Sequence, residues 1–294
     1  MRIVAENLTF TYNKKSKFAV DAVKDVSLTI EEGAFYGIIG HTGSGKSTFI
    51  QHLNGLIPVE KGKLLVGDID LSQDKKKIKK RLKELRSKVG MVFQYPEYQL
   101  FAETVFDDVA FGYKNFFPEK TDEEVKQAVF GALSLLGINS SLADKSPLDL
   151  SGGQKRRIAI AGVLVSKPEV LVLDEPVAGL DPIGKTELWK LLHFLHDSGE
   201  VKTIIVVSHD MDEVCENCTD VAVFSEGQVV LQGKPEEVFK NGERLKELRL
   251  DVPVTGYLTG ELEKIGISID SDFTRKDFVE KVVELYNKKK ENIE

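Results

Sequence analysis

The spacing of hydrophobic positions along the chain predicts an alternation of strands and helices. Compact apolar runs predict short strands at 1–10, 26–30, 34–39 and 89–93, and again in the segments VLVLDE and TIIVVSHD. Apolar residues recur at helical spacing over 152–166, and another helix is expected after Asp181. Strands that alternate with helices in this way favour a mostly parallel sheet with helices on both faces, which is an α/β fold.

Local boundary residues support two of the predicted helices. The segment TDEEVKQAVFGALSLLG is amphipathic, and Thr121 with Glu124 three residues later forms a capping-box pattern at its start. A helix that begins at Ser47 is expected to end at Asn54-Gly55, where a residue with positive φ can terminate it. Both helices therefore have a chemical reason to begin or end where the apolar pattern does.

The apolar pattern changes after Gly233, which predicts a boundary. Pro235 opens a helix, the segment DVPVTG interrupts the chain, and TRKD from Thr274 caps a final basic helix. A chain of 294 residues is long enough for one large domain and an additional lobe. We therefore expect a main domain over 1–234 and a small C-terminal lobe over 235–294, for which dimer contacts are a candidate role.

Composition and charge exclude several classes of protein. Hydrophobic residues make up 41% and charged residues 30%, as in an ordinary globular protein, and the formal net charge is -7. An acidic chain argues against nucleic-acid binding, which depends on Lys and Arg that neutralise phosphates. No apolar run approaches the roughly 20 residues that span a bilayer, and the N-terminus lacks a signal-peptide pattern. The expectation is a cytosolic chain.

Two features could be taken for functional sites but have simpler interpretations. The lysine-rich segment SQDKKKIKKRLKELRSK carries Ile78, Leu82 and Leu85 at helical spacing and has no interleaved aromatics, so a solvated helix face is favoured over a nucleic-acid patch. Cys215 and Cys218 form a lone CENC. A redox or zinc role is open, but without a second Cys or His pair we favour packing along a helix.

A glycine-rich segment after the strand at 34–39 has the residue types that hold phosphate. Residues 40–48 read GHTGSGKST and fit the phosphate-binding loop pattern between a strand and a helix. The glycines let main-chain N–H groups point inward, and the helix N-terminus adds its positive end. Lys46 is expected to reach the β- and γ-phosphates, Ser47 to ligate Mg²⁺, and His41 to act as a spacer. The candidate nucleotide-binding residues are Gly40, His41, Thr42, Gly43, Ser44, Gly45, Lys46, Ser47 and Thr48.

The segment VLVLDEP supplies two carboxylates at the end of a predicted buried strand. Asp174 is placed to ligate the metal, and Glu175 lies beside the expected position of an attacking water. A carboxylate there can polarise water for in-line attack on the γ-phosphorus. An apolar strand that ends in Asp-Glu is common, so it is evidence for a nucleotide site only together with the phosphate-binding loop upstream.

Further motifs follow in an order that resembles one family. The sequence LSGGQ opens the helix at 152, Gln94 ends a strand, Ala-Gly-Leu-Asp occupies 178–181, and Ser208-His209-Asp210 follows the last predicted strand. This order resembles the ATP-binding cassette (ABC) ATPase family over about 1–233. The resemblance implies a P-loop NTPase (RecA-like) core with an antiparallel β subdomain, an α-helical signature subdomain at about 95–160, and ATP as the nucleotide.

The resemblance also implies roles for individual residues. It makes Asp181 the dimer-communication aspartate, His209 the switch histidine, and Gln94 the glutamine that senses Mg²⁺ and the attacking water. It matches Tyr12 to the aromatic residue that stacks on adenine, although a tyrosine at a strand end is often simple packing. The signature residues, which in the family face ATP held by a partner subunit, are Leu150, Ser151, Gly152, Gly153 and Gln154.

Finer matches point to one branch of the family. The segment FQYPEYQLFAETVFDDVAFG resembles the Gln-loop region of the ATPases of energy-coupling factor (ECF) transporters. The segment LSGGQKRRIAIAGVLVSKPEVLVLDEPVAGLDP is similar to the second, A-prime type of ATPase subunit in that system. That resemblance implies an importer for vitamins or other micronutrients, with the chain on the cytoplasmic face of the cell membrane as a peripheral protein. Its partners would be a second ABC ATPase in a homo- or heterodimer, an integral membrane coupling subunit, and indirectly a substrate-binding membrane subunit. Val177 departs from the usual Thr or Ser and puts turnover rate in doubt.

Two alternatives remain at the level of sequence. A non-transport ABC ATPase of translation or DNA repair typically has two cassettes or a long coiled coil, and the chain shows neither pattern. A purely regulatory ATPase-like subunit would be expected to lack Glu175 or Lys46, and both are present. An ATP-hydrolysing transport subunit is the favoured prediction.

Overall fold

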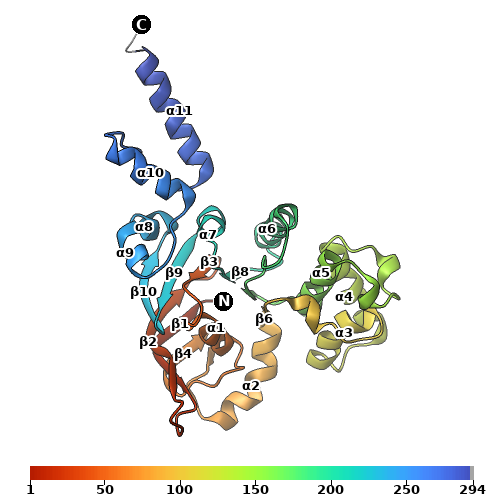
Figure 1. Ribbon diagram of the computed structural model, residues 1–294. Coiled ribbons are helices and arrows are strands. Elements are labelled where there is room, and N and C mark those ends of the chain that lie inside the picture. Colours follow the sequence, from red (N-terminus) through yellow and green to blue (C-terminus); the bar gives the residue numbers. More distant parts are fainter. Residues whose placement is uncertain (292–294) are drawn as a thin grey trace.

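The computed structural model describes residues 1–291, and its first sheet is antiparallel (Figure 1). This sheet has the order β2-β1-β4-β5. Its strands are β1 (Ile3–Tyr12), β2 (Val20–Ile30), β4 (Lys61–Val66) and β5 (Ile69–Asp70). The sequence pattern had placed strands at 1–10 and 26–30 only. It missed the first half of β2, where exposed and half-buried positions dominate, and β4, whose first three residues are exposed.

The second sheet is mostly parallel, as predicted from the alternation of strands and helices. Its order is β10-β9-β3-β8-β7-β6, and in the described part of the chain only the β10–β9 pair is antiparallel. The strands are β3 (Phe35–Ile39), β6 (Val89–Val92), β7 (Val170–Asp174), β8 (Thr203–Val207), β9 (Asp220–Ser225) and β10 (Gln228–Gly233). Every residue of β3, β7 and β8 is buried, which explains why their sequences are continuous apolar runs.

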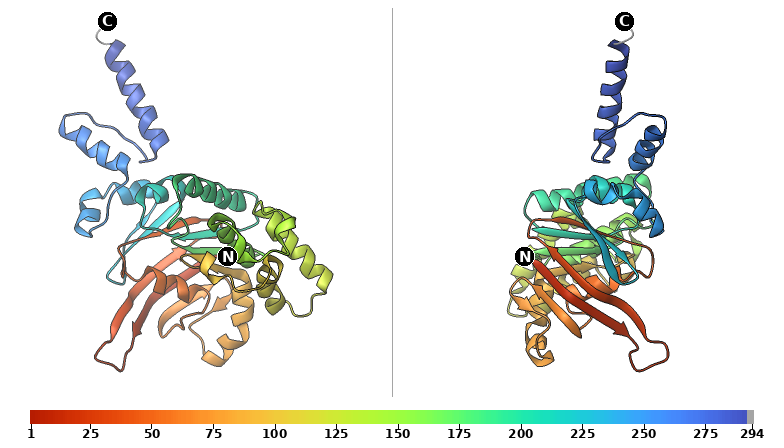
Figure 2. Two further views of the ribbon diagram at one scale, coloured as in Figure 1. Left: turned by 45° about the vertical axis from the view of Figure 1, so that its right-hand side comes forward. Right: turned by 90° about the vertical axis from the view of Figure 1, so that its left-hand side faces the viewer.

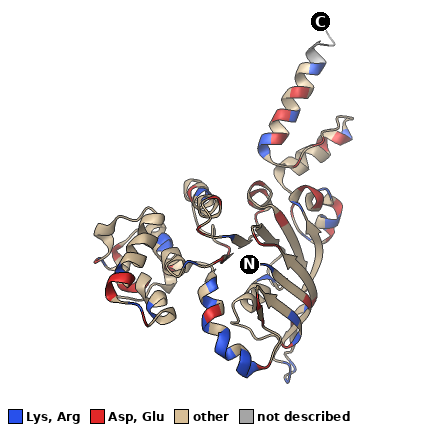
Figure 3. Cartoon of the chain, turned by 180° about the vertical axis from the view of Figure 1, so that it is seen from behind, with Lys and Arg blue, Asp and Glu red and all other residues tan. Residues whose placement is uncertain are grey.

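Several helices of the described chain lie near this sheet, and nearby residues explain the end of one and the exposed face of another. Among them are α1 (Lys46–Leu53), α2 (Lys75–Lys88), α6 (Pro182–Asp197) and α7 (Met211–Asn217). Gly55, with φ of 67°, ends the turn after α1, and a Cβ there would lie 2.6 Å from a Leu82 side-chain carbon. On α2 only Leu85 is buried, and many Lys and Arg positions, blue in Figure 3, lie along the helix. Arg81 forms ion pairs with Asp68 and Glu84. The solvated-face interpretation of α2 agrees with these contacts.

A cluster of helices stands to one side of the sheets in Figure 1. It contains the 3-10 helix η1 (Pro96–Gln99) and the helices α3 (Val105–Phe116), α4 (Asp122–Leu135) and α5 (Gly152–Leu164). The capping box predicted for α4 is present, because Thr121 Oγ1 accepts from Glu124 N and Glu124 accepts from Thr121 N. A core that includes Val109, Val129 and Ile158 holds the cluster together.

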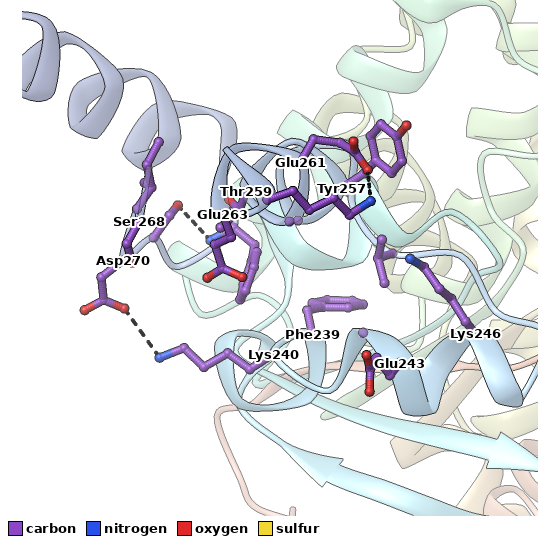
Figure 4. Close-up of a pocket in the computed structure, with 18 residues that line it drawn as sticks. Phe239, Lys240, Glu243, Lys246, Tyr257, Thr259, Glu261, Glu263, Ser268 and Asp270 are labelled. Atoms are coloured by element: carbon purple, nitrogen blue, oxygen red, sulfur yellow. Dashed lines mark hydrogen bonds and ion pairs between the residues drawn. The ribbon is translucent and has the colours of Figure 1, made fainter. Parts of the chain in front are cut away.

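The helices that follow β10 differ in where they lie. They are α8 (Pro235–Phe239), α9 (Gly242–Glu247), α10 (Val254–Lys264) and α11 (Arg275–Glu291). Helix α8 packs against β9 and β10, while α10 and α11 extend away from the sheets in both views of Figure 2. A cavity of about 880 Å³ lies among α8, α9, α10 and residues 268–273, with the Lys240–Asp270 ion pair at 3.6 Å on its wall (Figure 4). Within residues 1–291 no helix is long and apolar enough to cross a membrane.

The two cysteines lie at α7 and pack as small apolar side chains. Both are buried free thiols, and burial raises the pKa of Cys215 to about 12. Cys215 Sγ lies 3.7 Å from the carbonyl oxygen of Asp272, which joins α7 to the C-terminal segments. The packing interpretation of CENC therefore agrees with the structure.

Candidate active site

The loop between β3 and α1 requires glycine at two positions because of its own surroundings. Gly40 has φ of 152°, and an added Cβ would lie 2.3 Å from the Phe224 carbonyl oxygen. Gly45 has φ of 102°, and its Cβ would lie 2.2 Å from the Ala22 carbonyl oxygen. Such distances exclude any side chain without backbone movement. The glycine spacing read from the sequence is therefore enforced by the packing of β9 and β2 against the loop.

Lys46 is held against this loop by main-chain oxygens. Its Nζ donates to the carbonyl oxygens of Gly40 at 2.6 Å and His41 at 3.0 Å, and the residue is only 8% exposed. Burial lowers the pKa of Lys46, while the charges of Glu175 and Asp174 raise it. A buried ammonium that faces two carboxylates is suited to bind a polyphosphate.

A cavity of about 520 Å³ joins residues that lie far apart in the sequence. This volume is in the range of small-molecule sites. The cavity is lined by Tyr12, Val20, Asp21, Ala22, Thr42, Gly43, Ser44, Gly45, Lys46, Ser47, Thr48, Gln94, Asp174, Glu175 and His209. The β2 residues of this lining were missed by the sequence analysis, because nothing in the local pattern around Asp21 distinguishes it from other solvated positions.

His41 and Gly40 belong to the phosphate-binding loop but, unlike residues 42–48, are not part of the lining of the nucleotide cavity. His41 lines a separate cavity together with Arg244 and Arg249, while its main-chain oxygen accepts from Lys46. Its Nδ1 lies 2.8 Å from the Thr42 carbonyl oxygen. The interpretation of His41 as a spacer stays a prediction.

Two carboxylates enter the cavity from the end of β7. Burial raises the pKa of Asp174, while a hydrogen bond with Ser47 and the charge of Lys46 lower it. Glu175 adopts φ of 50°, which is costly for a residue with a side chain and is fixed here by its N–H, which donates to the Val207 carbonyl oxygen at 3.0 Å. The Ser47 hydroxyl and the Asp174 carboxylate form an all-oxygen donor pair, which fits Mg²⁺.

Glu175 contacts the histidine that follows β8. His209 Nδ1 lies 2.7 Å from Glu175 Oε2, and the side chains are 73% and 14% exposed respectively. Burial raises the pKa of Glu175, and the charge and hydrogen bond of His209 oppose that shift. A half-enclosed carboxylate with raised proton affinity is suited to accept a proton from water.

Tyr12 and Gln94 lie far apart in the sequence but line the same cavity. The Tyr12 ring packs edge-on against Phe10 at 4.8 Å, and its hydroxyl lies 3.4 Å from Thr48 Oγ1. It is 38% exposed, so one face stays available. Gln94 is exposed two residues after β6 ends. Both the packing and the stacking interpretation of Tyr12 therefore remain compatible with its position.

The signature segment lies outside the cavity lining and faces outward. Ser151 Oγ accepts from Gln154 N at 3.3 Å, and Gln154 Oε1 accepts from Ser151 N at 3.1 Å, so a capping box starts α5. Apart from the chain neighbours and the backbone of α5 itself, no described atom lies within 4 Å of a Cβ added at Gly152 or Gly153. Asp181, which is also exposed, caps α6 by accepting from Gly184 N at 2.7 Å. The glycines at the start of α5 are thus not required by the packing of this chain.

A buried ion pair near the site was not found from the sequence. Arg156 on α5 is 4% exposed and makes a two-pronged contact with Glu97 of η1. The two residues are 59 positions apart, and no motif in the sequence relates one to the other. The sequence therefore offered no means to pair them.

Known proteins match this chain in sequence and in fold. The family model described as ABC transporter matches residues 23–178, which is more than half of the chain, so the chain belongs to the ABC transporter family. It is an ABC-type ATPase that binds ATP. This class agrees with the P-loop NTPase fold predicted from the sequence.

Relatives within the family indicate the branch to which the chain is similar. The energy-coupling factor transporter ATP-binding protein EcfA2 of Caldanaerobacter subterraneus subsp. tengcongensis is 48% identical over 272 residues, which cover 92% of this chain and 93% of that protein. The EcfA2 protein of Clostridium tetani is 44% identical over 294 residues, 99% of this chain and 100% of its own length. The chain therefore groups with the ATP-binding subunits of ECF transporters.

Solved structures show the same fold. The cbiO1 protein of Clostridium perfringens, described as part of the ABC transporter complex cbiONQ, superimposes with a TM-score of 0.72 at 39% identity, covering 88% of this chain and 98% of that one. The cassette MJ0796, described as dimeric with ADP and Pi in a post-hydrolysis state, gives a TM-score of 0.69 at 28% identity, covering 79% and 98% of the two chains.

Proposed function

We propose that the chain hydrolyses Mg²⁺-ATP as one half of a head-to-tail ATPase pair that powers an ECF-type importer of vitamins or other micronutrients. The observation that supports this most directly is the convergence of Lys46, Asp174, Glu175 and His209 on one cavity, while the LSGGQ segment faces outward. The pair works on the cytoplasmic face of the membrane. We also propose that residues 1–234 form the cassette, with a helical subdomain at about 95–160, and that 235–294 contribute dimer contacts.

Within one cavity, each residue has a separate task. Main-chain N–H groups of the loop and the Lys46 ammonium bind the β- and γ-phosphates. Ser47, Asp174 and Gln94 are the residues that would hold Mg²⁺, which offsets phosphate charge when bound. Glu175 accepts a proton from the attacking water, and His209, 2.7 Å away, orients that carboxylate. The Tyr12 ring stacks on adenine.

The second half of each site comes from the partner ATPase. Ser151 and the N–H groups of Gly152 and Gly153 start α5 and are exposed, so they can bind the γ-phosphate held by the partner. Asp181 lies in the loop after the catalytic carboxylates and reports the state of one site to the other. Closure of the pair would then depend on ATP.

The connection to the membrane subunit is proposed at η1 and its neighbourhood. Tyr98 is 85% exposed, Phe101 66% and Phe111 53%, and the rings of Phe101 and Phe111 pack edge-on at 4.9 Å. The main-chain N–H groups of Phe101 and Ala102 donate to Asp108, which fixes the backbone of this surface. Exposed aromatic side chains on a fixed backbone are suited to bind a helix of a membrane protein.

The test is a pull-down of the tagged chain from detergent-solubilised native membranes, with partners identified by mass spectrometry. Recovery of a second ABC ATPase, a shared membrane subunit and small integral binding proteins would support the importer and identify its cargoes. Recovery only from the soluble fraction, together with ribosomes or DNA, would contradict the proposal and favour a non-transport ABC ATPase.

A further inference from the structure

A single buried guanidinium connects three parts of the site. Arg156 Nε and Nη2 donate to the two carboxylate oxygens of Glu97 at 3.0 and 2.9 Å. Its Nη1 donates to the Pro176 carbonyl oxygen at 2.9 Å, and Nη2 also donates to the Ala178 carbonyl oxygen at 3.0 Å. One side chain of α5 therefore joins η1 to the loop that follows β7.

The main-chain contacts of Arg156 bear directly on Glu175. Pro176 and Ala178 flank Val177, which is 4% exposed, and Ala178 N donates to the Glu175 carbonyl oxygen at 3.1 Å. Glu175 itself has φ of 50°, a conformation that persists only where neighbours hold it. A shift of these two carbonyl groups would therefore change the direction of the Glu175 carboxylate.

The other end of the connection lies beside the proposed membrane-facing surface. Glu97 sits in η1 next to Tyr98, which is 85% exposed, while the Glu97 side chain is only 17% exposed. Tyr95, with φ of 54°, places its ring against the same loop, since a Cβ at Gly179 would lie 3.4 Å from it. Burial raises the pKa of Glu97, but the hydrogen bonds from Arg156 and its own main chain lower it below its ordinary value. The carboxylate stays ionised and paired.

We infer that Arg156 is a positioning residue that transmits a displacement of η1, on which the membrane subunit docks, to the Glu175 carboxylate. The inference rests on the proposed function. Arginine is required because its planar fork reaches four acceptors at once, whereas the single ammonium of lysine cannot match that geometry. The charge alone would satisfy Glu97, but the Pro176 and Ala178 carbonyl groups would lose their donors.

The experiment uses the assembled transporter, with its partner ATPase and membrane subunits, in lipid vesicles. ATP hydrolysis and substrate uptake are measured for wild type, Arg156→Lys, Glu97→Asp and the double variant. Arg157→Gln is the matched control, because Arg157 is the next residue on α5 and forms a more exposed ion pair with Glu187, away from η1. Thermal melting of each purified complex checks that it is folded.

For Arg156→Lys we expect kcat to fall about 10- to 100-fold, as for a misplaced catalytic group, while KM for ATP stays within about twofold. Uptake per ATP hydrolysed should fall as well. Glu97→Asp shortens the same connection, so we expect a similar loss, and the double variant should lose no more than the worse single variant. Arg157→Gln should retain kcat and the uptake ratio.

Two results would overturn the inference. Folded Arg156→Lys and Glu97→Asp complexes with wild-type kcat and uptake per ATP would show that the contact is only structural. Equal changes in Arg157→Gln would show that α5, and not this connection, is responsible. A different result would contradict the proposed function itself: a wild-type chain that hydrolyses ATP but supports no uptake with any membrane partner. The inference about Arg156 would then be contradicted too, because it depends on that function.

Discussion

The phosphate-binding loop and the signature segment are both glycine-rich starts of helices, yet different surroundings act on their glycines. A Cβ at Gly45 would collide with the Ala22 carbonyl oxygen at 2.2 Å, whereas no described atom outside the chain neighbours and the backbone of α5 lies within 4 Å of a Cβ at Gly152. The first region is therefore constrained by this chain, which binds nucleotide with its own residues. In the second region the packing of this chain supplies no such constraint, which is expected if the segment binds the nucleotide of a partner, as we propose. We call the first region the self-contained half of the proposed shared site and the second its outward-facing half.

The strongest test of the self-contained half is Glu175→Gln. Glutamine keeps the shape but cannot accept the proton, so kcat should fall roughly 10²–10⁴-fold. ATP affinity should stay near wild type, because Lys46 and the loop are unchanged. Single-turnover hydrolysis and equilibrium ATP binding by the purified complex measure the two effects. Normal turnover would remove Glu175 from its proposed role.

A charge placed on the outward-facing half should impair turnover of the pair without affecting ATP binding by the self-contained half. Ser151→Arg inserts bulk and charge where the partner's ATP would bind, so we expect turnover of the assembled pair to fall about 100-fold, as when a transition-state donor is lost. ATP bound by this chain alone should be unaffected. Thr121→Arg is the matched control, since Thr121 is the N-cap of a capping box in α4 but lies away from the site. Unaltered activity of the Ser151→Arg pair would contradict a shared site.

The same substitution at two glycines sharpens the comparison. Gly45→Ala should destabilise the chain by about 1–3 kcal/mol, because the positive φ and the Ala22 contact both oppose a side chain. Gly152→Ala lies in the first turn of α5 without positive φ, so the isolated chain should be as stable or slightly more stable. Denaturant unfolding of both variants measures the difference. Equal stability of the two variants would mean that packing does not distinguish the two loops.

The sequence revealed the parts of the site whose chemistry is local. The phosphate-binding loop, Asp174, Glu175 and His209 each follow a buried strand of the parallel sheet, and such strands are continuous apolar runs that are easily recognised. Their carboxyl ends meet at one edge, so the sequence order already implied that these residues converge. Their individual roles stay predictions.

The parts that were missed depend on contacts between distant residues. The strands β4 and β5 are short or largely exposed. Only two residues separate α7 from β9, so the apolar run of β9 has no turn signal before it that would mark a new strand. Arg156 and Glu97 are 59 positions apart, and only the folded chain brings the fork of one to the carboxylate of the other. Nothing in a single sequence specifies such a pair.

The smallest expected effect concerns Tyr12, whose role is divided between packing and stacking. If its ring stacks on adenine, Tyr12→Leu should raise KM for ATP about 2- to 10-fold at unchanged kcat, since an aromatic pair contributes about 0.5–1.5 kcal/mol. Tyr12→Phe keeps the ring and loses only the 3.4 Å approach to Thr48, so it should behave as wild type. If the ring only packs against Phe10, Tyr12→Leu will lower the melting temperature and leave KM unchanged. That result would mean that Tyr12, at the end of β1, stabilises the fold and does not bind adenine. The residues of the self-contained half would then recognise the phosphates of ATP, and other residues would have to bind the adenine.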